Sequence, residues 1–460
     1  MIIGAVMVPH PPIAVHEVGK GEETKIQATL DAYDKAAQFI AELKPETIVL
    51  TSPHAIMYRD YFNISGGSGA YGDLGQFRAE QVTFDETYDT EFINVLESYL
   101  KEKSFPAGTE YDRDKMLDHG TMVPLYFIEK RYKDFKLVRI GLSGLPLVMH
   151  YELGMMIQKT AEETGRRVVV VGSGDLSHCQ KKDGPYGFRK EGPLYDDRIM
   201  KTMSSASFGE LLEYEPLLLE KSMECGHRSF AIMAGALDRT DVEAVPLSHE
   251  ATFGVGYGIV LYKPKGRNES RDFLDQYEAK VRNEISETAY GGDPFVSLAR
   301  KSVNTYVRTG RIMPVPAELN DELKKRAGVF VSIHEFDELR GCIGTISAAR
   351  RNIAEEIIHN AVSACSRDPR FSPVEEKELP YLQISVDVLG EAEPVSSLSE
   401  MDVKRYGIIV TKDSRRGLLL PDLDGVDTPQ DQYRIACRKA GIDPDEEDVE
   451  IERFEVIRHE

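Results

Sequence analysis

Three histidines each follow a short apolar segment that is typical of a buried β-strand. The pairs of segment and histidine are Ile2–Val8 with His10, Thr47–Thr51 with His54, and Val168–Val171 with His178. Neutral imidazole is the commonest metal ligand in proteins, and it can also exchange a proton near neutral pH. Because ligands bind outside the carboxyl ends of the strands in an open α/β sheet, we expect these histidines to lie along one edge of a sheet.

Two more positions extend this set. Glu224 opens a segment with helical spacing, and His119 follows Asp118 near a chain turn. Two histidines and one carboxylate leave open coordination positions on a metal, which is the ligand set of non-haem Fe(II) oxygenases. A further histidine outside the ligand set can act as a general acid or base. Each histidine alone is more often a structural residue, so the hypothesis of a metal site depends on their joint occurrence.

The segments that must position these residues alternate between strand-like and helix-like over residues 1–265. Helical spacing is evident in Thr29–Leu43 and in Met149–Thr164, between the apolar strands. This alternation predicts an α/β N-terminal domain over 1–265, with a mixed or parallel sheet and helices on both faces. A charged segment over 266–289, expected to be a linker or solvated helix, separates it from a smaller α+β domain over 290–460.

The composition restricts the class of protein. The chain has 460 residues, with 56 Lys and Arg against 77 Asp and Glu, which gives a formal net charge of −21. This acidity argues against a nucleic-acid partner, and the chain contains no apolar run long enough to predict a membrane span. The five cysteines are scattered and form no CxxC pair, which indicates a reducing, cytoplasmic location.

Five fragments in the first half of the chain together resemble the class III extradiol ring-cleavage dioxygenases of the LigB type and the related Memo-like proteins. The fragments are Val8-Pro9-His10-Pro11-Pro12, Ser52-Pro53-His54, Asp118-His119-Gly120, Gly174-Asp175-Leu176-Ser177-His178 and Glu224-Cys225-Gly226. They occur in this order, and the resemblance covers about residues 1–262. It implies a catechol or related small aromatic substrate, with O₂ as co-substrate.

The resemblance also implies roles for particular residues. It makes His10, His54 and Glu224 the ligands of Fe(II), and His178 the catalytic acid and base. His119 would then line the substrate pocket, and Asp175 would orient the imidazole of His178.

The third ligand has an alternative. Cys225 directly follows Glu224, and Memo-like relatives have a cysteine at the position that faces the metal. A thiolate would favour zinc or copper over Fe(II). Adjacent residues of a helix point about 100° apart, so only one of the two is expected to bind the metal, and we favour Glu224. With Cys225 as ligand, the domain could be a metal-binding or scaffold protein without dioxygenase activity.

A second motif lies in the C-terminal half. Leu339–Thr345 reads Leu-Arg-Gly-Cys-Ile-Gly-Thr and is expected to be a glycine-rich turn. Within it, Cys342 beside Arg340 could be an activated catalytic thiolate, because nearby cations lower the pKa of a thiol. The alternative is a buried structural cysteine. His359 and Arg370 are the other candidate residues of this site.

The C-terminal motif resembles the AMME-syndrome candidate (AMMECR) family, over about residues 290–460. The fusion of both halves resembles the bacterial AmmeMemoRadiSam system proteins called protein A. The name of those proteins reflects their company with a Memo-like protein and a radical SAM enzyme, which are therefore candidate partners. This chain lacks the CxxxCxxC motif of a radical SAM enzyme.

Overall fold

The computed structural model describes residues 1–112, 116–290, 292–423 and 425–460. The chain forms two compact units, Met1–Glu278 and Ala279–Glu460, and each is described by itself. None of the described helices is both long enough and apolar enough to cross a lipid bilayer.

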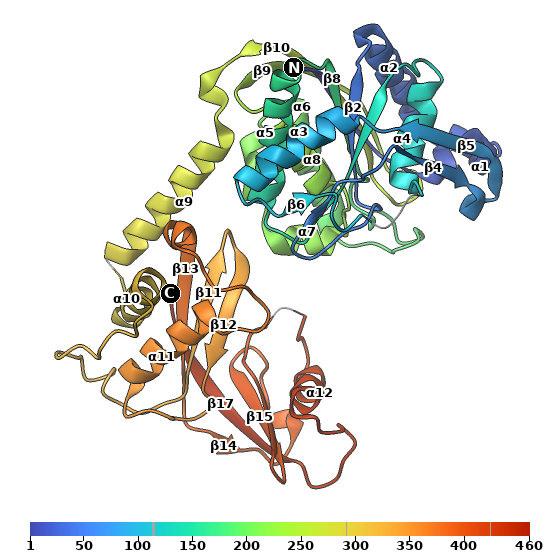
Figure 1. Cartoon of the computed structure of the whole chain (residues 1–460). Helices are drawn as coiled ribbons and strands as arrows, with labels where there is room; N and C mark the ends of the chain where they lie inside the picture. Colours follow the sequence, from blue (N-terminus) through green and yellow to red (C-terminus); the bar gives the residue numbers. More distant parts are fainter. Residues whose placement is uncertain (113–115, 291, 424) are drawn as a thin grey trace. The chain divides into compact units, whose positions relative to one another are not determined.

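The N-terminal unit is built on a six-stranded sheet, in which four neighbouring strands are parallel and two at one side are antiparallel (Figure 1). In spatial order the strands are β7 (Lys136–Gly141), β2 (Thr47–Ser52), β8 (Val168–Ser173), β1 (Ile2–Val8), β10 (Tyr257–Arg267) and β9 (Thr240–Glu250). The strands β2 and β8 are buried along their whole length, as expected for the centre of a sheet covered on both faces.

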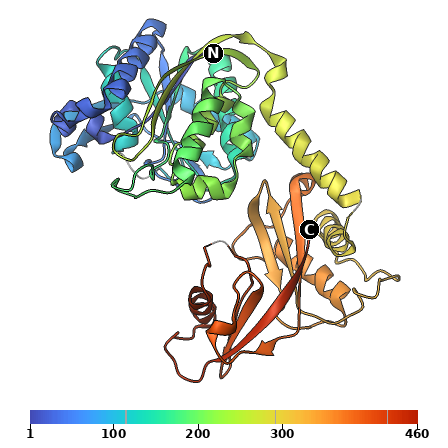
Figure 2. The same ribbon diagram turned by 180° about the vertical axis from the view of Figure 1, so that it is seen from behind.

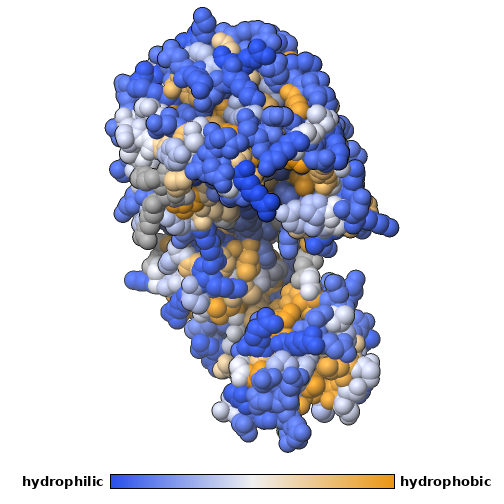
Figure 3. Space-filling view, turned by 90° about the vertical axis from the view of Figure 1, so that its right-hand side faces the viewer, coloured by the Kyte–Doolittle hydropathy of each residue, from blue (hydrophilic) through white to orange (hydrophobic). Residues whose placement is uncertain are grey.

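Helices cover both faces of this sheet, which Figure 2 shows from the opposite side. One face carries α2 (Gln27–Leu43) and α4 (His119–Glu129), which contact each other. The other carries α3 (Thr90–Glu102), α5 (Leu147–Glu163) and α8 (His227–Gly235). The predicted α/β class is therefore confirmed. Figure 3 shows a mainly hydrophilic surface on this unit with scattered apolar residues.

The remaining elements of the unit were not anticipated from the sequence. They are α1 (His16–Gly19), α6 (Glu191–Ser204), α7 (Pro216–Ser222), the short pair β3 (Phe62–Asn63) and β6 (Ala107–Gly108), and the hairpin of β4 (Gly69–Leu74) and β5 (Ala79–Thr87). Because β1, β2 and β8 are parallel neighbours, their carboxyl ends lie at the same edge of the sheet. The predicted histidines of the site follow these strands at this edge.

A pair of carboxyl groups, of which one is buried and the other half-buried, joins the hairpin to α4. Glu86 on β5 faces Glu129, and burial together with this second carboxyl raises the pKa of Glu86 to about 8. In the unfolded chain the pKa of this group is near its ordinary value of 4.5, so the N-terminal unit loses stability as the pH rises from about 4.5 to about 8.

Glu86→Gln is expected to stabilise the N-terminal unit by about 2 kcal/mol at pH 8, because it removes this ionisation. The gain should vanish near pH 4, where Glu86 is protonated in both states. Thermal unfolding at a series of pH values measures the effect. Glu80→Gln, at an exposed position of the same strand, serves as the control. A gain of equal size at pH 4 would contradict this explanation.

The C-terminal unit is α+β, with an antiparallel sheet curved into a half-barrel, and its predicted class is confirmed. In spatial order the strands are β12 (Glu338–Gly344), β11 (Val329–Glu335), β13 (Leu382–Leu389), β17 (Glu450–His459), β15 (Tyr406–Lys412) and β16 (Arg415–Leu419), with β14 (Glu393–Pro394) beside β17. The long strand β17 joins both halves of the sheet, as Figures 1 and 2 show in red.

Three helices pack against this sheet. They are α10 (Pro294–Thr309) and α11 (Ile353–Ser366), which share a core with β11 and β13, and α12 (Pro429–Ala440), which packs on β15 and β16. The segment predicted as a charged linker or helix lies largely in α9 (Phe273–Tyr290).

The motif at Leu339–Thr345 is a strand and not the glycine-rich turn that we expected. Its residues form most of β12, where Cys342 pairs with Ser332 on β11. The two glycines permit close packing: a Cβ at Gly341 would overlap the backbone of Ala364, and one at Gly344 would overlap the ring of Phe330. The two glycines therefore allow neighbouring atoms to pack closely against β12, and they do not form a turn.

Candidate metal centre

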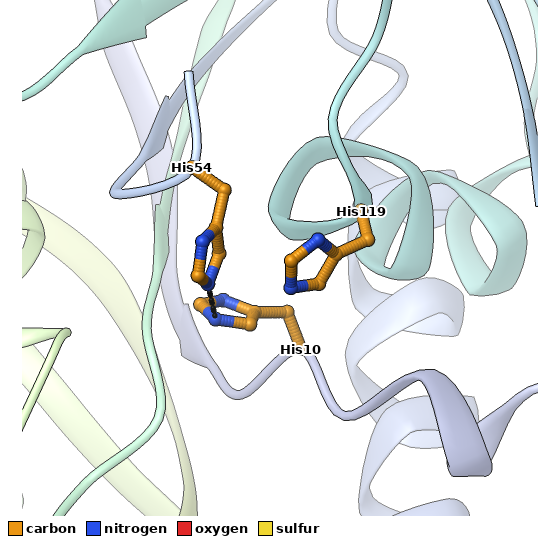
Figure 4. Close-up of side chains that lie close together, drawn as sticks. All are labelled: His10, His54 and His119. Atoms are coloured by element: carbon orange, nitrogen blue, oxygen red, sulfur yellow. Dashed lines mark hydrogen bonds between the residues drawn. The ribbon is translucent and has the colours of Figure 1, made fainter. Parts of the chain in front are cut away.

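Three imidazole rings converge at the carboxyl edge of the N-terminal sheet (Figure 4). The potential ligand atoms of His10, His54 and His119 all lie within 4.8 Å of one another. The Nε2 atoms of His10 and His54 are 3.0 Å apart. This separation suits two nitrogen ligands of one ion at about 2.1 Å, because cis ligands at that distance are about 3 Å apart.

The surroundings of His10 leave its Nε2 atom available as a ligand. The Ser173 hydroxyl donates its proton to the Gly120 carbonyl, so it can only accept from His10 Nδ1, 3.0 Å away. His10 therefore carries its proton on Nδ1, and the Nε2 lone pair faces the cluster. A hydrogen bond of this kind commonly fixes the tautomer of a metal-binding histidine.

Burial keeps two of the three imidazoles neutral. Burial and, to a smaller extent, the neighbouring His54 together lower the pKa of His10 to about 3. The pKa of His119 also falls to about 3, through burial and then through His54 and His10. Neutral imidazole is the form that binds a metal ion. The donor set and its protonation state therefore fit a transition-metal ion.

An ion pair holds His119 in place. His119 is the first residue of α4, and Asp118 caps this helix by accepting from the backbone N–H of Thr121 at 3.0 Å. Asp118 also accepts from Ser52 at 2.5 Å and pairs with Arg139 at 2.9 Å. Burial alone would raise the pKa of Asp118, but Arg139 and the hydroxyl donors hold it below its ordinary value.

The predicted third ligand is not among the three residues that converge. The carboxylate of Glu224 accepts from the backbone N–H of His227 at 2.6 Å, where it caps the start of α8, and burial raises its pKa to about 7. Cys225 instead lies beside the cluster, with its Sγ 3.6 Å from His10 Nε2. The assignment of Glu224 or Cys225 as a ligand stays a prediction.

Close packing of two glycines brings Cys225 to this position. A Cβ at Gly174 would overlap Gly226, so only glycine allows the loops after β8 and before α8 to approach this closely. The backbone N–H of Asp175 then donates to Cys225 Sγ at 3.3 Å. Both Glu224 and Cys225 precede α8, which begins at His227, so the expectation that they lie on the helix is wrong.

His178 lies close enough to the cluster to act on the charge of His10. Its Nδ1 is 2.5 Å from the Met223 carbonyl, which can only accept, so the Nε2 atom carries the lone pair. In the structure this carbonyl is the partner of His178 Nδ1, and the expectation that Asp175 orients His178 stays a prediction. Asp175 Oδ1 accepts from the backbone N–H of His10 at 2.7 Å, and burial raises the pKa of Asp175 to about 6.

The candidate residues of the C-terminal unit do not all meet. Cys342 and Arg370 line one cavity. Arg340 instead pairs with Glu378 at 2.7 Å. His359 lies on α11 and does not line that cavity.

The residues that support the histidines were not predicted from the sequence. Arg139 is a cation in the middle of an apolar strand, which is itself a signal of a buried partner. Ser173 lies at the end of β8, where a polar side chain between two glycines could also have been recognised. The contact with the Met223 carbonyl could not be predicted from the sequence, because every residue has a backbone carbonyl.

Two families match the chain, one in each unit. Residues 4–260 match the family described as the catalytic LigB subunit of aromatic ring-opening dioxygenase. Residues 296–459 match the AMMECR1 family. Because the first match covers more than half of the chain, the chain belongs to the LigB family through its N-terminal domain, which is fused to an AMMECR1 domain.

The whole two-domain arrangement is shared with a protein of Clostridium acetobutylicum, named Protein CA_C1420. The two chains are 38% identical over 465 residues, which cover 99% of this chain and 98% of the relative. A protein of Thermotoga maritima is 48% identical over 171 residues, which cover 37% of this chain and 98% of its own. Among solved structures, the uncharacterized protein PH0010 from Pyrococcus horikoshii covers 36% of this chain and 89% of its own, with 31% identity and a TM-score of 0.35.

Proposed function

We propose that the N-terminal domain is a non-haem Fe(II)-dependent oxidoreductase that cleaves a catechol or related aromatic ring with O₂. The observation that supports this most directly is the convergence of His10, His54 and His119 in a chain of the LigB family. In this proposal His10, His54 and Glu224 hold the metal. When bound, Fe(II) would supply the electrons and the open coordination positions that O₂ chemistry requires.

The chain's own groups would handle the substrate and its protons. His178 Nε2 carries a lone pair and can accept a proton from a catechol hydroxyl, while Nδ1 stays bonded to the Met223 carbonyl. His119 contacts the edge of Phe77, with ring centroids 5.5 Å apart, and these two rings offer an aromatic wall for the substrate.

A second candidate function is supported by the position of Cys225. Its Sγ lies 3.6 Å from His10 Nε2, whereas the Glu224 carboxylate is engaged by the His227 N–H. In this alternative the domain is a Memo-like metal-binding or scaffold protein that holds zinc or copper and works with a radical SAM enzyme. It would consume no O₂ with any aromatic.

Metal analysis of the anaerobically reconstituted full-length protein tests the proposal. We expect about one Fe(II) per chain in the wild type and in Cys225→Ala, and loss of iron in Glu224→Ala. O₂ uptake with catechol should disappear in His178→Ala while iron stays bound. His359→Ala, in the C-terminal unit, is the control and should keep both properties.

The opposite pattern would favour the second function. Loss of metal in Cys225→Ala, retention in Glu224→Ala, a preference for zinc or copper, and no O₂ uptake would together overturn the dioxygenase proposal. O₂ uptake that survives in His178→Ala would contradict the role given to that histidine.

A further inference from the structure

The C-terminal unit contains a cavity of about 1220 Å³ on its half-barrel sheet. One part of its wall is a row of small polar side chains on three neighbouring strands. Ser385 on β13, Ser332 on β11 and Cys342 on β12 are paired in register, and all three line the cavity. The Ser332 hydroxyl donates to Cys342 Sγ at 3.2 Å, so the thiol lies at the wall of the cavity.

Positive charge prevails around this cavity. Six cationic side chains line it, against three acidic ones; the cations are Arg300, Lys301, Arg370, Arg416, Lys439 and Arg458. The whole chain has a net charge of −21, so this local excess reverses the overall trend. A concave surface lined with charge of one sign attracts ligands of the opposite sign.

Two of these cations lie next to Cys342. The Arg370 guanidinium donates to the Cys342 carbonyl at 3.1 Å and to Asp368 at 2.6 Å. Asp368 also accepts from the Cys342 backbone N–H at 2.9 Å, so one carboxylate positions both groups. The hydrogen bond from Arg370 lowers the pKa of Asp368 to about 2, which keeps this carboxylate ionised.

Lys439 is the second of these cations and lacks a counter-ion. It extends from α12, and within the described residues no carboxylate pairs with it. Burial lowers its pKa, and both Cys342 and Arg370 are close enough to perturb it. The Lys439 ammonium lines the cavity, is open to solvent and has no carboxylate partner among the described residues, so it is a group with which a bound anion would pair.

Another part of the wall is apolar. Phe330 and Leu418 line the cavity and pack with Ile346 and Leu420 in one cluster. A site with an apolar wall and a few convergent polar groups is typical of a pocket for a small organic molecule.

We propose that this cavity binds a small organic anion. Its carboxylate or phosphate lies beside Lys439 and Arg370, next to the Cys342 thiol, and its apolar part contacts Phe330 and Leu418. The inference is independent of the metal site in the N-terminal domain.

Alkylation of Cys342 in the full-length protein tests the site, because iodoacetate is an anion and iodoacetamide is its neutral counterpart. Both displace iodide by attack of the thiolate, and mass spectrometry of the Cys342 peptide gives each rate. Relative to glutathione, the ratio of the iodoacetate rate to the iodoacetamide rate should be about fivefold higher at Cys342. Lys439→Gln should return the ratio close to that of glutathione.

The neighbouring Arg438→Gln is the matched control, because it removes the same charge from an exposed position of α12 that does not line the cavity. It should leave the ratio unchanged. Competition by inorganic phosphate or by benzoate then distinguishes the two anion classes, since the stronger competitor identifies the group that is bound. The proposal is overturned by a ratio equal to that of glutathione, by equal effects of both variants, by lack of competition, or by failure of both reagents to reach Cys342.

Discussion

His10→Ala is expected to lower the affinity of the N-terminal domain for a divalent transition metal by about 100-fold or more. Loss of a group that only orients a ligand commonly costs 10- to 100-fold, so loss of the ligand should cost at least as much. His10 is central to the cluster, since its Nε2 is 3.0 Å from His54 Nε2 and 3.6 Å from Cys225 Sγ. Titration with Fe(II) or Zn²⁺ under anaerobic conditions measures the effect.

Two further variants make this test specific. Ser173→Ala removes the acceptor of the His10 Nδ1 proton, together with the bond from Ser173 to the Gly120 carbonyl, so it should weaken binding about 10-fold while every ligand remains. His16→Ala changes an exposed histidine that pairs with Glu23, and it should leave the affinity unchanged. Equal metal affinity in His10→Ala and the wild type would show that these histidines are structural.

The N-terminal sheet could be predicted because its strands are buried on both faces. The apolar run at Val168–Val171 is recognisable for this reason, and β8 extends it by only two residues, to Ser173. The strands β1 and β2 end at the same edge of the sheet, so His10 and His54 lie close together, as expected. The hairpin β4–β5 was not predicted. The pairing of its two strands is irregular at Asp73 and Leu74, and exposed positions in both strands weaken the alternation of apolar and polar residues.

The prediction of Glu224 as the third ligand assumed that a helix begins at Glu224. Sequence patterns do not fix the residue at which a helix begins. The apolar spacing that follows Glu224 indicates a helix, but α8 begins only at His227. Whether Glu224 or Cys225 faces the cluster depends on the turn between Met223 and His227, and this turn is set by the contact of Gly174 with Gly226. A contact between residues so far apart in the sequence leaves no local periodicity.

The glycines of β12 led to the other error. Glycine pairs usually indicate a turn, but Gly341 and Gly344 are required because Ala364 and Phe330 lie against them. The resulting strand directs Cys342 to the cavity wall beside Ser332, so a motif that looked like a loop supplies part of a sheet surface.

Arg139→Met is expected to destabilise the N-terminal unit by about 3–5 kcal/mol, because it leaves a buried carboxylate without its counter-ion. Only 1% of the Arg139 side chain is exposed, and 9% of that of Asp118. The guanidinium also donates to the Met116 carbonyl at 3.0 Å. Urea unfolding followed by circular dichroism measures the loss.

The double variant Arg139→Met/Asp118→Asn separates loss of the charge pair from loss of packing. Asparagine is neutral and can still cap α4, so the double variant should be more stable than Arg139→Met alone. Arg131→Met, which breaks the exposed pair with Asp34, should change the free energy of unfolding by less than about 1 kcal/mol. If the double variant were less stable than Arg139→Met, the ion pair would not be the cause. Because Asp118 caps the start of α4, Arg139→Met should also disturb the position of His119, the first residue of that helix.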